Sequence, residues 1–161
     1  MLTDARTQDP ATATARGDAP EADAEAMLAT ATRQRRAVTV ADCRVLIVDD
    51  FGTVRMVQRQ ALSELGITDI TEASNGADAL RLIERDEFDL IVTDWNMPEM
   101  TGLELLRQIR YLDSTLPVVL VTTNCDRSEV LAAAREGISA YVVKPFKRTA
   151  YQDTISGVLG I

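Results

Sequence analysis

Five polar residues in this chain stand where short apolar runs end: Asp49, Asp50, Asp94, Thr122 and Lys144. An aspartate carboxylate can act as a nucleophile that forms an aspartyl-phosphate. A metal ion and a lysine can neutralise the oxygens of a phosphoryl group during its transfer, and a threonine hydroxyl can donate a hydrogen bond to another oxygen. These residue types therefore suggest phosphoryl transfer, provided that the fold brings them together.

The three aspartates would repel one another if they met in space. Two like charges about 4 Å apart repel by about 4 kcal/mol at an effective dielectric constant of about 20. The ammonium of Lys144 would offset one charge, and a divalent cation would offset the rest. Ligation by oxygen atoms, with some retained water, suits Mg²⁺. We therefore expect Mg²⁺ to be the cofactor of such a site.

The elements that would position these residues alternate between strands and helices. The central apolar run, residues 90–92, is too short for a helix, and it leads to Asp94 and then to Asn96-Met97-Pro98, which continues neither element well. Strands are expected at 45–48, 69–73, 90–92, 118–121 and 141–143, and helices at about 54–65, 76–83, 101–109, 126–136 and 149–159. Such alternation predicts an α/β fold in which a parallel sheet is covered on both faces and its carboxyl-end edge gathers these polar residues.

Local signals mark the helix boundaries and faces. Starts are expected at Asn75-Gly76, at Thr101 with Glu104 as a capping box, and at Asp126, and ends at Gly66 and Gly137. Helical spacing assigns Val54, Val57, Ala61, Leu62 and Leu65 to the buried face of the first helix, and Val130, Leu131 and Ala134 to that of the fourth. No glycine-rich loop follows the first strand, so a P-loop and a dinucleotide site are both unsupported.

Composition narrows the classes of function further. The chain has 161 residues, of which 46% are hydrophobic, which fits one globular domain plus a tail. The net charge of −8 argues against binding to nucleic acid or to an anionic membrane surface. No apolar run approaches the ~20 residues of a membrane span, and no signal peptide is apparent. Two cysteines and no histidine exclude a disulfide framework and His-based sites, so a cytoplasmic location is expected.

Residues 1–40 differ from the rest of the chain and are expected to be a disordered extension. They are rich in Ala and Thr and nearly lack bulky apolar residues, so they cannot bury enough surface to offset the entropy of ordering. A short docking helix, or a true start at Met27 or later, are the alternatives. The folded domain is expected at residues 41–161.

Each candidate residue also has an ordinary structural interpretation. Asp49 and Asp94 could be turn or helix-capping residues, Thr122 could be present for its strand propensity, and Lys144 could be a solvated strand end. Tyr141 and Trp95 could be partly buried aromatics, and Thr123-Asn124 a plain turn. The functional interpretation depends on the whole set, because one topology brings these strand ends to one edge.

The sequence resembles the receiver domain of two-component response regulators. The similarity runs from about Cys43 to the end of the chain, and it is strongest to single-domain, CheY-like chemotaxis regulators. It is carried by Val48-Asp49-Asp50, Thr93-Asp94-Trp95-Asn96-Met97-Pro98, Gly102-Leu103-Glu104-Leu105-Leu106, Val121-Thr122 and Tyr141-Val142-Val143-Lys144-Pro145-Phe146. The resemblance implies a flavodoxin-like, doubly wound sheet of five parallel strands in the order 2-1-3-4-5 with five helices.

The resemblance also implies roles for the site residues. Asp94 would accept a phosphoryl group from a phosphohistidine of a sensor histidine kinase. Asp50, Asp94 and the backbone carbonyl of Asn96 would bind Mg²⁺ directly, and Asp49 mainly through water. Lys144 would contact a phosphoryl oxygen. The peptide bond between Lys144 and Pro145 would be cis, although trans is the commoner state of such bonds.

Signalling would follow from a change of shape. The resemblance implies that Thr122 moves toward the phosphoryl group and that Tyr141 swings inward. The face made by the fourth helix, fifth strand and fifth helix would then bind a downstream protein, the flagellar motor switch being one candidate. A phosphatase would be a further partner. The protein would not be an enzyme in the usual sense, although it would promote its own phosphorylation and dephosphorylation.

Several positions depart from the common family pattern or vary within it. Thr101 stands where Asp is frequent, and only a capping role is expected there. Asn96 and Asn124 occupy positions that tune the lifetime of the phosphoryl group. Thr123 is bulkier than the usual small residue, so we hypothesise that it hinders the attacking water. In that case Thr123→Ala should shorten the half-life of the phosphoryl group.

Other functions compete with this interpretation. A phosphate sink or a non-motor adaptor would share the site and differ only in partner, and a degenerate receiver would not be phosphorylated at all. A haloacid dehalogenase-like phosphatase also uses an aspartate at a strand end, but it requires a second Asp two residues on, where this chain has Asn96. No segment after Phe146 is long enough for an output domain, so output through protein contact is expected.

Overall fold

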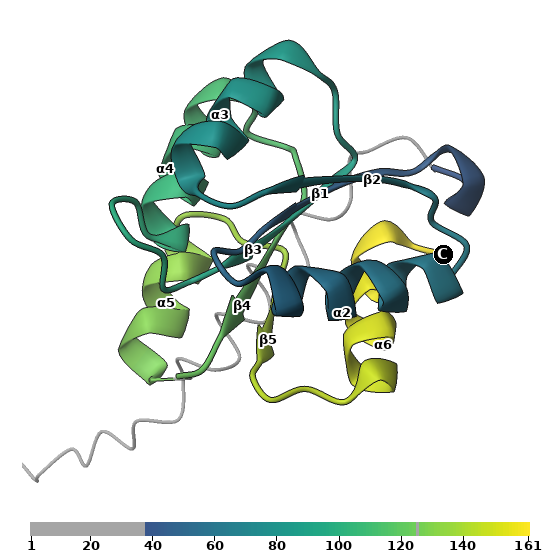
Figure 1. The fold of residues 1–161 in the computed structure, drawn as a ribbon. Helices are drawn as coiled ribbons and strands as arrows, with labels where there is room; N and C mark the ends of the chain where they lie inside the picture. Colours follow the sequence, from purple (N-terminus) through teal and green to yellow (C-terminus); the bar gives the residue numbers. More distant parts are fainter. Residues whose placement is uncertain (1–37, 125) are drawn as a thin grey trace, which may run out of the picture.

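The apolar runs of the sequence form a sheet of five parallel strands (Figure 1). The computed structural model describes residues 38–124 and 126–161. The strands are β1 (Arg44–Val48), β2 (Asp69–Ala73), β3 (Leu90–Asp94), β4 (Val118–Thr122) and β5 (Ala140–Val143). Their order in the sheet is β2-β1-β3-β4-β5, so the flavodoxin-like fold expected from the family resemblance is confirmed.

Helices cover both faces of this sheet. They are α2 (Gly52–Glu64), α3 (Gly76–Arg85), α4 (Gly102–Leu112), α5 (Arg127–Arg135) and α6 (Arg148–Leu159), and a short 3₁₀ helix, η2 (Val40–Asp42), precedes β1. Figure 1 shows α2 and α6 on one side of the sheet and α3, α4 and α5 on the other. No helix in the described part of the chain is both long and apolar enough to cross a membrane.

Alternate side chains of the strands supply two separate hydrophobic clusters. Leu46, Ile91 and Leu120 point to the side of α3, α4 and α5. Ile47, Val92 and Val121 point to the side of α2 and α6, where Tyr151 and Ile155 of α6 pack against them. The three central strands, β1, β3 and β4, are therefore buried on both faces, as is typical of parallel sheets.

The helix boundaries follow the local signals in the sequence. Asn75 caps α3 by accepting a hydrogen bond from the amide of Asp78, and Thr101 forms a complete capping box with Glu104 at the start of α4. Asp126 caps α5 by accepting from the amide of Ser128. Gly66 and Gly137 follow α2 and α5 with φ of +93° and +84°, a conformation that glycine adopts without steric cost.

The expected buried faces of two helices need correction. Val57 was assigned to the core face of α2, but its side chain is 44% exposed, and Gln58 is fully buried in its place. In α5 the buried residues are Ala133 and Ala134, whereas Val130 and Leu131 are only half-buried. In both helices the buried positions therefore differ from those that the apolar pattern assigned.

The expectation of disorder in residues 1–40 falls largely outside the described residues, which begin at Val38. Val38 and Val40 pack against the cluster beneath α2 and α6. Cys43, at the start of the sheet, is a free and buried cysteine. Burial raises the pKa of its thiol to about 12, with Asp89 and Asp69 adding to the shift.

Candidate functional site

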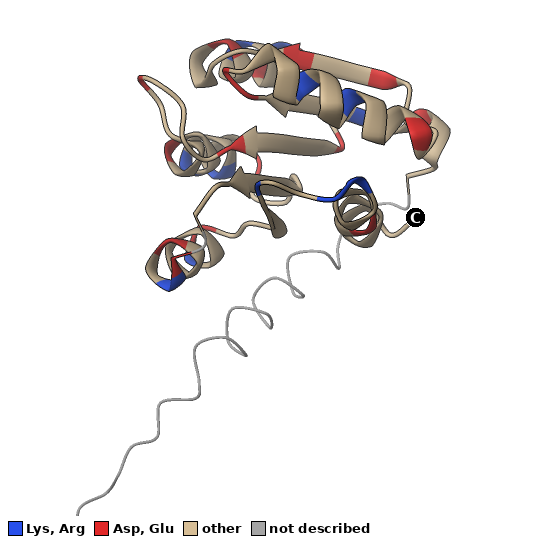
Figure 2. Ribbon diagram, turned by 60° about the horizontal axis from the view of Figure 1, so that its bottom comes forward, with Lys and Arg blue, Asp and Glu red and all other residues tan. Residues whose placement is uncertain are grey.

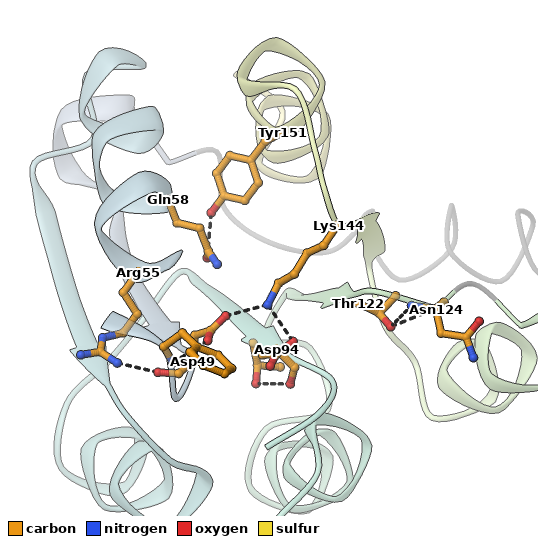
Figure 3. A network of polar contacts seen from close by, with 10 residues as sticks. Asp49, Arg55, Gln58, Asp94, Thr122, Asn124, Lys144 and Tyr151 are labelled. Carbon is orange, nitrogen blue, oxygen red and sulfur yellow. Dashed lines mark hydrogen bonds and ion pairs between the residues drawn. The ribbon is translucent and has the colours of Figure 1, made fainter. Parts of the chain in front are cut away.

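The polar residues singled out in the sequence meet at the carboxyl-end edge of the sheet (Figure 3). Asp49 follows β1 directly, Asp94 is the last residue of β3, Thr122 is the last of β4, and Lys144 follows β5. Asp49 is fully buried, and Asp94 and Thr122 are 4% and 2% exposed. The strand register places these ends side by side, with Val48 paired to Thr93 and Asp94 paired to Val121.

Lys144 links the two buried aspartates. Its Nζ atom donates to Oδ2 of Asp49 at 3.0 Å and to Oδ1 of Asp94 at 3.1 Å. These partners are 95 and 50 residues away along the chain, so the contact exists only because three strands end at one edge. The Lys144–Pro145 peptide bond is cis, which agrees with the family resemblance.

Asp50 completes a group of three acids. Asp49, Asp50 and Asp94 each offer a carboxylate oxygen, and these oxygens lie within 4.8 Å of one another. Oδ1 of Asp50 is buried and has no hydrogen-bond partner among the described residues, and a buried acceptor of this kind is costly unless something binds it. Three converging carboxylates with one unpartnered oxygen fit a hard divalent cation such as Mg²⁺.

The electrostatics of the site favour a reactive carboxylate beside a charged lysine. Burial raises the pKa of Asp94, an effect that the Lys144 hydrogen bond opposes and the charge of Asp49 reinforces. Burial on its own would lower the pKa of Lys144, but hydrogen bonds to Asp49 and Asp94 outweigh it and raise that pKa. Lys144 therefore remains an ammonium at neutral pH, and Asp94 is a poorly solvated carboxylate.

Further contacts position the acids, and two of them come from Arg55 and Phe51, to which the sequence analysis gave no role. Arg55 of α2 donates from Nη1 to the carbonyl oxygen of Asp49 at 2.6 Å, and the amide of Phe51 donates to Oδ1 of Asp49 at 2.9 Å. Gly102 lies so close to the carbonyl oxygen of Asp94 that a Cβ atom at that position would overlap it. An arginine one turn into the helix after paired acids was the available signal for Arg55.

The hydroxyl of Thr122 forms hydrogen bonds with Asn124 and not with Asp94. Its hydroxyl donates to the carbonyl oxygen of Asn124 at 2.8 Å and accepts from the amide of Asn124 at 3.1 Å (Figure 3). Thr123 and Asn124 are exposed, and Asn96 is exposed in the loop after β3. The structure therefore brings Asp49, Asp50, Asp94 and Lys144 into one cluster and leaves these neighbours around its rim.

Tyr141 is an exposed aromatic residue. It belongs to the edge strand β5 and is 39% exposed, and Val143 of the same strand is 36% exposed. An apolar groove of about 360 Å³ opens beside Lys144, between the start of α2 and the loop after β5, and its lining includes Val57, Thr123 and Phe146. The exposure of Val57, which the helical pattern did not predict, is explained by this groove.

Comparison with known proteins agrees with this geometry. The family model of the response regulator receiver domain matches residues 45–156. The chain is 42% identical over 117 residues to the chemotaxis protein CheY of Pseudomonas aeruginosa. The aligned region covers 71% of this chain and 94% of that protein. It is 38% identical over 117 residues to CheY-3 of Vibrio cholerae, with coverages of 71% and 90%.

Solved structures give the same result. The chemotaxis protein CheY4 of Vibrio cholerae superposes with a TM-score of 0.68 at 29% identity, covering 72% of this chain and 98% of that one. A CheY-like receiver domain protein from Methanospirillum hungatei gives a TM-score of 0.69 at 27% identity, with coverages of 73% and 94%. The fold, the matched region and the acidic site therefore all agree with a receiver domain.

Proposed function

The chain belongs to the response regulator receiver domain family, and from that premise we propose that it accepts a phosphoryl group on Asp94 in a chemotaxis-type phosphorelay. It is a CheY-like receiver domain. The observation that carries the proposal is the contact of Lys144 with both Asp49 and Asp94, beside an unpartnered oxygen of Asp50.

The proposed reaction is a nucleophilic displacement at phosphorus. A carboxylate oxygen of Asp94 forms a bond to the phosphorus atom of a phosphohistidine of a sensor histidine kinase, and the bond between phosphorus and the imidazole nitrogen breaks. The imidazole leaves with the electron pair of that bond. The product is an aspartyl-phosphate on this chain and an unphosphorylated histidine on the kinase.

Several residues would contribute to this phosphoryl transfer in different ways. Lys144 is already held at the carboxylate of Asp94, and its ammonium would donate to an oxygen of the incoming phosphoryl group. Asp49, Asp50, Asp94 and the carbonyl of Asn96 would hold Mg²⁺, which would neutralise charge on the phosphoryl oxygens. Asp49 is oriented for this by the amide of Phe51.

We further propose that phosphorylation alters the face made by α5, β5 and α6. Thr122 would exchange its hydrogen bonds with Asn124 for one to the phosphoryl group, and Tyr141, now half-exposed, would move inward. Asn96, Thr123 and Asn124 surround the site and would set the lifetime of the phosphoryl group. The hypothesis that Thr123 slows hydrolysis is supported by its place in the groove beside Lys144.

The partner on that face would be a protein, with the flagellar motor switch as the first candidate because the similar proteins carry chemotaxis names. A phosphate sink or a non-motor adaptor would use the same site with another partner or none, and a dedicated phosphatase would be a further partner.

The cytoplasm is the proposed location, where the free thiol of Cys43 would stay reduced. A haloacid dehalogenase-like phosphatase is disfavoured because Asn96 cannot transfer a proton.

The direct test is to incubate the protein with Mg²⁺ and acetyl phosphate and to measure its intact mass. We expect the mass to increase by one phosphoryl group in the wild-type protein and not in Asp94→Asn, and chelation of Mg²⁺ should prevent the increase. A wild-type mass that does not change, or an Asp94→Asn variant that gains the same mass, would refute the proposal. A pull-down with and without beryllium fluoride would then identify the downstream partner.

A further inference from the structure

A polar pair lies buried in the apolar layer between α2 and α6, outside the acidic site. Tyr151 of α6 and Gln58 of α2 are both fully buried, and the Tyr151 hydroxyl donates to Oε1 of Gln58 at 3.3 Å (Figure 3). Nε2 of Gln58 has no hydrogen-bond partner within the described ranges. A buried amide with an unpaired half destabilises the fold, whereas two aliphatic side chains would pack here without that cost.

The aromatic ring of this pair is connected to the acidic site. Tyr151 stacks on Phe146, with ring centroids 5.0 Å apart and an angle of 23° between the planes. Phe146 is two residues beyond Lys144, whose ammonium bridges Asp49 and Asp94. Gln58 lies in α2, the helix that begins two residues after Asp50, the second of the acids that follow β1. The pair therefore joins the two segments that supply the lysine and the first aspartates.

The sheet holds the segment that carries Lys144 from one side only, where the Lys144 amide donates to the carbonyl oxygen of Thr122 at 2.7 Å. β5 is a short edge strand, and its residues Tyr141 and Val143 are exposed by more than a third. One face of the loop after β5 borders the open groove, which Pro145 and Phe146 line. Burial raises the pKa of Tyr151, so its hydroxyl stays protonated and remains a hydrogen-bond donor.

We infer that Tyr151 is a positioning residue for phosphoryl transfer: anchored by Gln58, its ring holds Phe146, and through this loop it keeps the Lys144 ammonium between Asp49 and Asp94. The inference rests on the proposed function, because it assigns a role in that same site. It predicts that Tyr151 matters for binding of the phosphoryl group, which Lys144 would contact, and not for binding of Mg²⁺, whose proposed ligands lie at the ends of β1 and β3.

The test separates these two binding steps. Trp95 is the only tryptophan of the chain and adjoins Asp94, so its fluorescence can report both Mg²⁺ binding and beryllium fluoride binding at saturating Mg²⁺. In Tyr151→Leu, which removes the ring, we expect the dissociation constant for beryllium fluoride to rise about tenfold. In Tyr151→Phe, which keeps the stack and removes the anchor, we expect a rise of about threefold. The dissociation constant for Mg²⁺ should change less than twofold in both variants.

Ile155→Val is the matched control, because it trims a fully buried side chain of the same helix and keeps the Tyr151–Phe146 stack and the Tyr151–Gln58 hydrogen bond. It should lower the melting temperature and leave both dissociation constants unchanged. Beryllium fluoride binding in the Tyr151 variants that equals that of Ile155→Val would overturn the inference, as would a parallel loss of Mg²⁺ affinity. If Tyr151→Leu does not fold, Tyr151→Phe decides. A wild-type protein that responds to neither ligand would overturn the proposed function and this inference together.

Discussion

Two charged clusters share Asp49 and have opposite character. Its side chain belongs to the acidic site, where three carboxylates face one ammonium, that of Lys144. Its backbone carbonyl accepts from Arg55, which also pairs with Glu72 of β2 at 2.9 Å. Arg59 pairs with the second oxygen of Glu72 at 2.5 Å, so this neighbouring cluster has two guanidinium groups around one carboxylate.

The pKa directions show what this difference means for stability. Burial raises the pKa of Asp94, so ionising it in the folded protein is unfavourable. The hydrogen bond from Arg59, together with Arg55, lowers the pKa of Glu72, so ionising it favours folding. The acidic site therefore holds like charges together at a cost that a cation can relieve, whereas the cluster of Glu72 stabilises the fold without any ligand. Variants that neutralise a carboxylate, Asp94 in one cluster and Glu72 in the other, should therefore change stability in opposite directions.

The largest effect is expected from Lys144→Met. The variant leaves Asp49, Asp50 and Asp94 without their cation, and breaking a buried ion pair in this way costs about 3 kcal/mol in the free energy of unfolding. Mg²⁺ should recover part of the loss, because it replaces the missing positive charge. Urea unfolding with and without Mg²⁺ measures both quantities. A variant as stable as the wild-type protein in metal-free buffer would show that the carboxylates do not repel as supposed.

Asp94→Asn should have the opposite sign. Since the folded protein raises the pKa of Asp94, its ionised form destabilises the fold at neutral pH, and replacing it with a neutral amide should raise the free energy of unfolding without metal. The stabilisation that Mg²⁺ gives should shrink at the same time, because one ligand is lost. Thermal unfolding in chelator and in Mg²⁺ tests this pair of changes, and a destabilised metal-free variant would contradict it.

Glu72→Gln probes the other cluster and should destabilise the fold by about 0.5–1 kcal/mol at pH 7. Because the folded pKa of Glu72 lies below its ordinary value of 4.5, its contribution is complete above that value and is lost as the pH falls through the folded pKa. The difference from wild type should therefore vanish in acid. Denaturant unfolding across this pH range is the measurement, and phosphorylation by acetyl phosphate serves as the control that should not change.

The acidic site and the strands and helices that position it could be predicted from the sequence for the same reason. Apolar runs of strand length and capping residues such as Thr101 act locally, and a parallel sheet then brings the strand ends to one edge. The sequence alone predicts that Asp94 and Lys144 lie close together, because Asp94 ends one strand and Lys144 directly follows another.

The residues that escaped prediction depend on contacts between distant elements. Gln58 is buried because Tyr151, 93 residues later, reaches its amide, and helical spacing alone favours Val57 for that face. The position of Arg55 after the paired acids was a signal in the sequence, but its partner is a backbone carbonyl, which only the folded structure identifies. The hydrogen bonds of Thr122 with Asn124 likewise depend on the path of one loop. Periodicity assigns a helix its apolar face, but contacts with distant elements decide which neighbouring residue is buried.

The smallest effect is expected from Arg148→Ala, which removes an ion pair of 2.7 Å between α6 and Glu64 of α2. The side chains of Arg148 and Glu64 are 52% and 38% exposed, so water already solvates both charges. The variant should therefore lower the free energy of unfolding by about 0.3 kcal/mol. The pair joins the same two helices as Gln58 and Tyr151, yet it should leave beryllium fluoride binding unchanged. Denaturant unfolding and the Trp95 titration test the two statements. A loss as large as that of Glu72→Gln would mean that position between elements, and not burial, decides what a charge contributes in this protein.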